Sequence, residues 1–178
     1  MKINNVRITS ASTLNTEFTS TAPICAFCGR YSDLALDLLR ELIGDCGAQN
    51  DPDRVDDGRF VIHADIEMDN KNYDVCYIRN ADFMGDNRLA VNFEPNSIRF
   101  SEDDTREFVK RCDEDGHSPV FIYCLDRLDE EIDVTPVLDK LSSLGRQVFI
   151  AVCSNYPIEK LKHNAVQIVH TEADDDEN

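Results

Sequence analysis

The chain has 178 residues, of which 42% are hydrophobic, which is enough for one domain with a real core and too few for two of ordinary size. Its 35 acidic and 18 basic residues give a formal net charge of −17, and this field repels phosphate backbones, so we expect no direct binding of nucleic acid. Neither a signal-peptide pattern nor an apolar run of about 18 residues occurs, so we expect a cytoplasmic protein without a membrane span. In that reducing compartment, most of the seven cysteines should be small buried side chains.

The N-terminal segment combines strand patterns with one helix. Lys2–Ile8 and Thr13–Phe18 alternate between apolar and polar residues and predict an edge hairpin. Pro23–Phe27 predicts a short strand, after which Ser32 or Asp33 is a suitable N-cap for a helix. The apolar residues of this helix fall on one face: Ala35, Leu38, Leu39, Leu42 and Ile43. Glycines follow directly and end the helix.

The middle of the chain has the residue pattern of antiparallel strands. Residues 60–68 and 73–77 alternate strictly, and the turn cluster Asp69–Asn72 separates them, so they predict an antiparallel hairpin. Residues 89–93 add a third strand. We therefore expect an antiparallel insertion at about residues 59–100, on whose first strand His63 is interpreted as a surface histidine.

The C-terminal part alternates helices and strands. The predicted elements are a helix from the capping box at Ser101 to about Cys112, a strand Val120–Leu125, a helix from Asp133 or Thr135 to Gly145, a strand Gln147–Cys153, a short helix from Tyr156 to about Lys162 and a strand Ala165–His170. The helix before Gly145 has an apolar stripe made of Val137, Leu138, Leu141 and Leu144. With its flanking strands it predicts a βαβ unit and therefore parallel strands.

These elements predict the α/β class, with a mostly parallel sheet and an inserted antiparallel β-meander. We expect one domain over residues 1–171 and an acidic, disordered tail over residues 172–178.

Two stretches together resemble a P-loop ATPase head of the ABC type, in particular the SMC/RecF-like heads. PICAFCGRYSDLALDLLREL stands where that family has a strand, a glycine-rich phosphate loop and a helix. FIYCLDRLDEE and VLDKLSSLGRQVFIAV stand where it has the Walker B strand, a helix and the next strand. The resemblance implies a P-loop NTPase-like fold, with ATP and Mg²⁺ as candidate ligands. It places Ile24–Tyr31 close to Asp126, on adjacent strands. The positions that it offers for a nucleotide or anion are Cys28, Gly29, Arg30, Tyr31, Ser32, Asp126 and Asp129.

The chain departs from this family at the reactive positions. A phosphate loop needs glycines to curl around the phosphate, a Lys for its oxygens and a Ser or Thr for Mg²⁺. Ile24 stands for the first glycine, Arg30 for the Lys and Tyr31 for the Mg²⁺ ligand. Asp126 is followed by Arg127, where the family has a Glu that polarises water. The signature sequence and the switch histidine are also missing from the sequence.

Phosphoryl transfer depends almost wholly on positioning and charge stabilisation, so these losses should leave little turnover. We therefore predict a catalytically impaired ATPase-head-like domain, with no assigned catalytic residue, that acts as a protein-interaction or assembly module. Its expected partner is a protein, and a true ATPase is one candidate.

Two enzymatic alternatives stay open. In the first, Arg30 and Ser32 replace the missing groups in a divergent, ATP-binding ATPase of the SMC/RecF-like class. In the second, Cys25 and Cys28 carry out thiol–disulfide exchange, because a C-x-x-C pair between a strand and a helix N-terminus matches the position of a redox pair.

The sequence predicts no metal centre, because no complete set of four ligands with suitable spacing is apparent. Five carboxylates gather near the end of the strand at residues 120–125: Asp126, Asp129, Glu130, Glu131 and Asp133. We interpret them as a solvated loop and a helix N-terminus, whose dipole acidic groups offset. A divalent cation held by their oxygens is the alternative.

Overall fold

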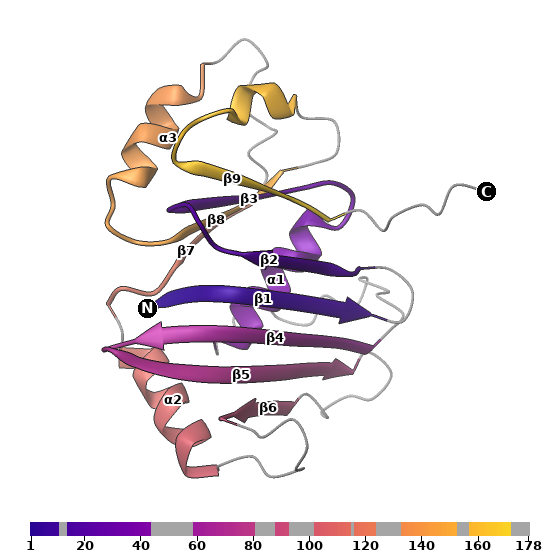
Figure 1. Cartoon of the computed structure of the whole chain (residues 1–178), viewed down its shortest axis with the longest axis vertical. Helices are drawn as coiled ribbons and strands as arrows, with labels where there is room; N and C mark the ends of the chain where they lie inside the picture. Colours follow the sequence, from indigo (N-terminus) through magenta and orange to yellow (C-terminus); the bar gives the residue numbers. More distant parts are fainter. Residues whose placement is uncertain are drawn as a thin grey trace, which may run out of the picture.

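The computed structural model describes residues 1–10, 14–43, 59–80, 88–92, 102–114, 116–123, 133–152 and 157–171. These residues form a mixed α/β structure with one antiparallel and one parallel sheet, which lie one below the other in Figure 1. The elements in chain order are β1 (Lys2–Ser10), β2 (Thr16–Thr19), β3 (Ile24–Cys28), α1 (Ser32–Leu42), β4 (Arg59–Met68), β5 (Lys71–Asn80), β6 (Arg88–Val91), α2 (Glu102–Glu114), β7 (Val120–Ile122), α3 (Thr135–Ser142), β8 (Val148–Val152), η2 (Ile158–Leu161) and β9 (Val166–His170).

The antiparallel sheet has the strand order β2-β1-β4-β5-β6. The predicted hairpins β1–β2 and β4–β5 are confirmed, but β1 also pairs with β4, so the N-terminal hairpin and the inserted strands build one sheet. Asp69 and Asn70 close β4–β5 with φ of 51° and 61°, the left-handed values that a two-residue hairpin turn requires. The predicted insertion is thus part of a larger sheet that begins at Lys2.

The parallel sheet has the strand order β7-β8-β3-β9. Its strands β3 and β8 are buried on both faces, as expected for parallel strands covered on both sides. β7, α3 and β8 form the predicted βαβ unit. The expected adjacency of Ile24–Tyr31 and Asp126 is wrong at the level of strands, because β8 lies between β3 and β7. Asp126 itself lies outside the described residues.

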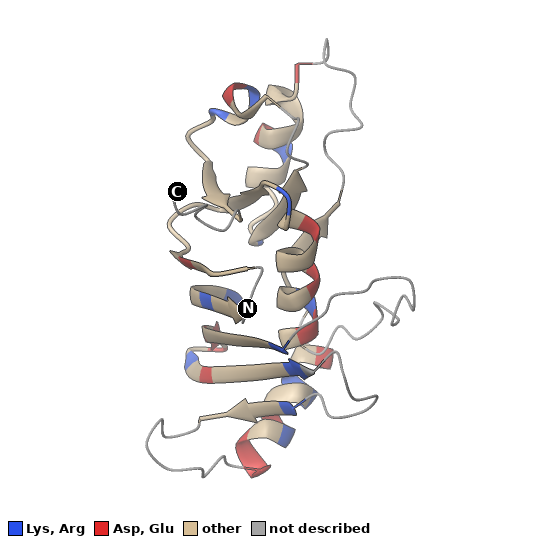
Figure 2. Cartoon of the chain, turned by 90° about the vertical axis from the view of Figure 1, so that its right-hand side faces the viewer, with Lys and Arg blue, Asp and Glu red and all other residues tan. Residues whose placement is uncertain are grey.

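Helix α1 packs against both sheets. In Figure 2 it runs along the same side of the two sheets, and its Leu38 and Leu39 are fully buried in one hydrophobic cluster with Phe149 of β8 and Ile62 of β4. The predicted cap is wrong: the helix starts after Tyr31 without a side-chain cap, and Ser32 is buried. Burial of a long apolar stripe, rather than capping, therefore holds this helix in place.

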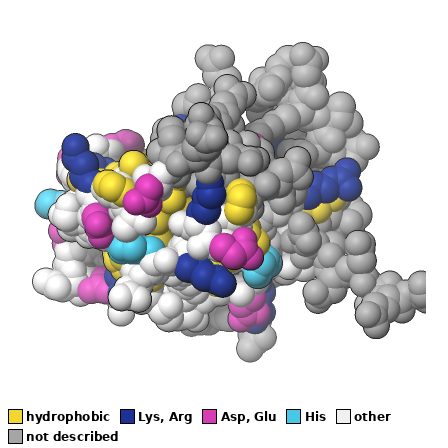
Figure 3. Space-filling view, turned by 90° about the horizontal axis from the view of Figure 1, so that it is seen from above, with side chains coloured by type: hydrophobic (Ala, Val, Ile, Leu, Met, Phe, Trp, Pro, Cys, Tyr) yellow, Lys and Arg dark blue, Asp and Glu magenta, His cyan; other side chains and the backbone are white. Residues whose placement is uncertain are grey.

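Helix α3 covers the other face of the parallel sheet. Leu138 is buried there in a second cluster with Ile24 and Ile150. The predicted stripe is only partly correct, because Val137 and Leu144 are 41% and 45% exposed. Seen from above, where α3 and η2 lie, the described surface mixes charged groups of both signs with hydrophobic side chains (Figure 3).

Side-chain amides join the two sheets. The Oε1 atom of Gln147, just before β8, accepts the N–H of Ile3 at 2.8 Å, and its Nε2 donates to the Ile3 carbonyl at 2.7 Å and to Ser20 Oγ at 2.7 Å. Gln167 of β9 donates to the Thr19 carbonyl at 2.9 Å. At this seam between the two sheets, the side-chain amides take the place of the backbone hydrogen bonds that would connect neighbouring strands in a continuous sheet.

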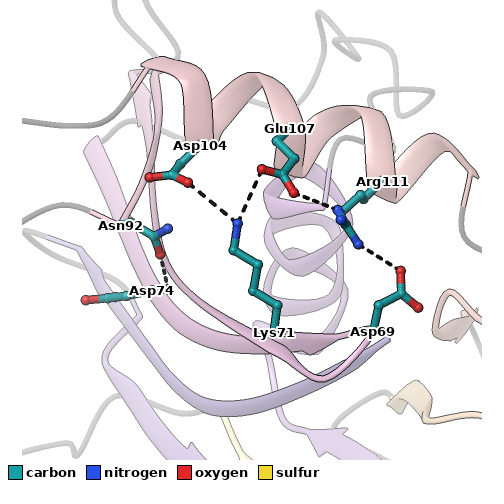
Figure 4. A network of polar contacts seen from close by, with 7 residues as sticks. All are labelled: Asp69, Lys71, Asp74, Asn92, Asp104, Glu107 and Arg111. Atoms are coloured by element: carbon teal, nitrogen blue, oxygen red, sulfur yellow. Dashed lines mark hydrogen bonds and ion pairs between the residues drawn. The ribbon is translucent and has the colours of Figure 1, made fainter.

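Charged side chains fix α2 to the β4–β5 hairpin (Figure 4). Lys71 Nζ lies 3.3 Å from Glu107 and 3.7 Å from Asp104, and Arg111 lies 3.0 Å from both Glu107 and Asp69. These partly exposed pairs each contribute little, so the buried contact of Phe108 with the sheet does most of the anchoring. None of the helices in the described ranges has the length and apolarity needed to span a membrane.

Candidate functional site

The corner between β3 and α1 is where the resemblance predicts a phosphate loop. Strand β3 continues through Cys28 and α1 begins at Ser32, so only three residues connect them. Gly29 takes φ of 121°, a value that favours glycine, and its carbonyl accepts the N–H of Ser32 at 3.2 Å. A Walker A motif spans eight residues, most of them in the loop. Of the eight corresponding residues in this protein, Ile24–Cys28 belong to β3 and residues 29–31 form a tight turn.

Side chains and a neighbouring strand fill this corner. Cys28 and Ser32 are each only 3% exposed. The Cys28 carbonyl accepts the Thr171 N–H at 3.0 Å and the Thr171 hydroxyl at 3.1 Å. Arg30 is exposed, and its guanidinium lies 5.5 Å from the centroid of the half-buried Tyr31 ring. Of the predicted anion-binding residues in this corner, Arg30 alone offers a solvent-exposed donor side chain.

The carboxylates predicted after β7 are only partly described. Asp126, Asp129, Glu130 and Glu131 lie outside the described residues. Asp133 is exposed, and its Oδ1 accepts the N–H of Thr135 at the start of α3, at 3.0 Å. Hydrogen bonds from the Thr135 side chain and backbone lower the pKa of Asp133. This agrees with its interpretation as a helix N-terminal acid.

A polar link between α1 and the end of β7 was not predicted. Tyr123 donates to Asp37 at 2.6 Å and accepts a hydrogen bond from Arg40 at 3.1 Å. Asp37 is only 6% exposed, although it lies on a helix among leucines. That buried position requires a hydrogen-bonding partner, but the sequence pattern alone cannot identify Tyr123 as that partner.

The cysteines of the C-x-x-C pair lie on opposite faces of the parallel sheet. Cys25 packs in the cluster under α1 and Cys28 in the cluster under α3. Three steps along a strand separate their Cα atoms by about 10 Å, whereas a disulfide requires less than about 7 Å. Burial raises the pKa of both thiols, that of Cys28 to about 11. The structure therefore provides no reactive dithiol for the redox alternative.

In the described ranges, no group of three or more His, Cys, Asp or Glu side chains is placed so that it could hold a metal ion. The residues in the place of the switch histidine, 153–155, lie outside these ranges.

Comparison with known proteins adds no assignment. No protein-family model matches the chain, and no curated protein matches it. Any function must therefore be argued from the residues and their arrangement.

Proposed function

We propose that this protein is a protein-interaction or assembly module, built on an ATPase-head-like framework, that hydrolyses little or no ATP. The observation that carries the proposal is the three-residue connection between β3 and α1. A phosphate cradle is formed by successive backbone N–H groups of a long loop, and a turn of this length cannot surround a phosphate.

The side chains of the corner support the same conclusion. A single exposed arginine gives only a weak, screened interaction with a triphosphate. The hydroxyl of Ser32 is buried and cannot reach a Mg²⁺ ion without rearrangement of the helix start. The divergent ATPase that would use Arg30 and Ser32 is therefore the less favoured reading.

The strand arrangement agrees with the proposed framework in strand direction and differs from it in strand spacing. β3 and β7 are both parallel to β8, so their carboxyl ends open on one edge of the sheet, as in the proposed framework. They stand two strand spacings apart, about 10 Å, instead of side by side. We infer that the fold serves recognition: with a net charge of −17, it favours a partner with a basic surface.

Steady-state phosphate release by the full chain at saturating Mg²⁺-ATP tests this proposal. We expect no release above the buffer background, and the same result for Arg30→Ala and Ser32→Ala. Steady turnover that Arg30→Ala abolishes would establish the divergent ATPase instead. Circular dichroism of both variants ensures that loss of fold does not imitate loss of activity.

A further inference from the structure

A groove of about 400 Å³ lies at the seam between the two sheets, beside the starts of β1, β3 and β8. The connection from β2 to β3 and the residues just before β8 line it, together with Lys2 of β1. Gln147 holds these segments together, because its buried amide bonds both backbone groups of Ile3 and the hydroxyl of Ser20. The walls of the groove are therefore fixed before a ligand arrives, and the size of the groove suits a small molecule.

The groove reverses the charge of the rest of the molecule. The chain has a net charge of −17, yet the charged side chains among the described lining residues are those of Lys2 and Arg146. No Asp or Glu of the described ranges lines the groove. Lys2 lies opposite Glu67 in the β1–β4 ladder, but neither Lys2 nor Arg146 forms an ion pair with a described residue. Two positive charges are thus left to attract a negatively charged ligand.

Arg146 is held in a fixed orientation. Its Nε donates to the Ser118 carbonyl at 2.7 Å, and its Nη2 donates to the same oxygen. Because a carbonyl is neutral, this contact orients the guanidinium without cancelling its charge. An arginine has five N–H donors, and the three that this carbonyl leaves unused can make a planar, bidentate contact with an oxyanion. The side chain is half-buried, which reduces the screening of its charge by salt.

Two hydroxyl groups of the groove are used in other contacts. The Thr21 hydroxyl donates to Gln167 at 3.2 Å, and the Ser142 hydroxyl donates to the Asp139 carbonyl at 2.8 Å. The two basic side chains are therefore the main side-chain donors, and no carboxylate among the described lining residues can accept from a ligand's ammonium group. This donor set discriminates against amines and favours a ligand whose oxygens carry negative charge.

We propose that this groove, with Lys2 and Arg146 as its anchoring groups, binds a small organic dianion, either a phosphate monoester or a dicarboxylate. Two positive groups match a charge of −2, and charge-assisted hydrogen bonds are the strong ones. Ala22 and Pro23, which have no polar side-chain atoms, line the same groove and can contact the ligand's carbon skeleton. The groove lies before β3, whereas the β3–α1 corner follows that strand, so this site goes beyond the proposed function and does not depend on it.

Nitrogen–proton NMR spectra of the full, isotope-labelled chain test the site, with glycerol phosphate and succinate as separate probes at low ionic strength. We expect at least one probe to shift the amide signals of residues 145–147 saturably, and added salt to weaken its binding. Arg146→Gln should lower the affinity at least about tenfold, because it removes charge-assisted contacts. Lys2→Gln should also lower it. The matched control Arg30→Gln, at the opposite end of β3, should leave the affinity unchanged.

Two outcomes would overturn the site: no saturable shift at residues 145–147 with either probe, or wild-type affinity in both Arg146→Gln and Lys2→Gln. The spectra also report the fold of each variant, and the exposed Lys2 keeps the test valid if loss of Arg146 disturbs the structure. Shifts confined to residues 28–32 that Arg30→Gln removes would place the anion at the β3–α1 corner, and would count against the proposed function as well. Absence of binding at both places would overturn the groove alone, so the two failures are distinguishable.

Discussion

The parallel and the antiparallel sheet use their faces in different ways. Both faces of β3 and β8 are covered, one by α1 and the other by α3. Within the described residues, helices cover the antiparallel sheet on one face, and its other face carries polar and titratable side chains. A sheet buried on both faces can present reactive groups only at its ends, and the β3–α1 end is closed here. The difference shows that the open face of the antiparallel sheet, unlike either face of the parallel sheet, presents titratable side chains to solvent, among them Asp65 and Asp74.

The largest expected effect concerns the doubly buried sheet. Phe149 is fully buried on β8 and stacks on Phe27 and Phe121 at centroid distances of 6.1 Å and 5.6 Å. Phe149→Ala should lower the free energy of unfolding by about 3–5 kcal/mol, because it leaves a cavity that the sheet cannot close. Urea denaturation measures this loss. The free energy of unfolding of Val137→Ala, at an exposed position of α3, should stay within about 0.5 kcal/mol of the wild type. Equal losses in the two variants would contradict the contrast between a buried and an exposed position.

The next effect concerns the seam between the sheets. Gln147→Ala leaves the N–H and the carbonyl of Ile3 without their buried partner. We expect a loss of about 2–3 kcal/mol in the free energy of unfolding, since unsatisfied buried groups retain their desolvation penalty. Gln167→Ala, whose amide is more exposed, should cost clearly less. If the two losses were the same, the seam would not depend on burial of Gln147.

On the open face, removal of a charge should stabilise the protein. Asp74→Asn ends the repulsion by Asp65 and should raise the free energy of unfolding by about 0.2–1 kcal/mol at pH 7 without metal. The pKa of Asp74 is raised in the folded state, so the native state binds the extra proton, and wild-type stability falls as pH rises from about 3.9 through the folded pKa. The gain should therefore vanish below about pH 3.9. Denaturation of both proteins in the presence of a chelator measures this gain. If Asp74→Asn were instead less stable than the wild type at pH 7, the Asp74 carboxylate would already be stabilised in the native protein.

The smallest effect concerns α3. Thr135 lowers the pKa of Asp133, so this carboxylate stabilises the fold above its unfolded pKa of about 3.9, and that contribution disappears as pH falls through the folded pKa. Asp133→Ala should lower Tm slightly at pH 7 and leave it unchanged in acid. Asp113→Ala, at the C-terminal end of α2, removes an acid from the unfavourable end of a helix dipole and should not lower Tm. Identical Tm shifts for both variants would argue against a stabilising role of the Asp133–Thr135 hydrogen bond.

Local periodicity made most helices and strands predictable, but it did not predict the order of the strands in the sheets. Strict alternation predicted the β4–β5 hairpin, and continuous apolar runs predicted β3 and β8. The position of β8 between β3 and β7 depends on long-range packing, which periodicity does not encode. The pairing of β1 with β4 was missed for the same reason.

Small errors in the predicted ends of a strand and of a turn hid which side chains share a face of a sheet. The sequence pattern predicts a strand that ends at Phe27, whereas β3 continues to Cys28. Because Cys28 belongs to the strand, the two thiols of the C-x-x-C pair lie on opposite faces. The predicted turn spans Asp69–Asn72, whereas Asp69 and Asn70 alone form it in the structure. That change of register is what brings His63 opposite Cys76.

The most direct test of the account is a calorimetric titration of Mg²⁺-ATP into the full chain at low ionic strength. The closed β3–α1 corner predicts no saturable heat, and no difference between the wild type and Arg30→Ala. Saturable, tight binding that Arg30→Ala removes would show that this corner opens to a nucleotide, and it would contradict the account.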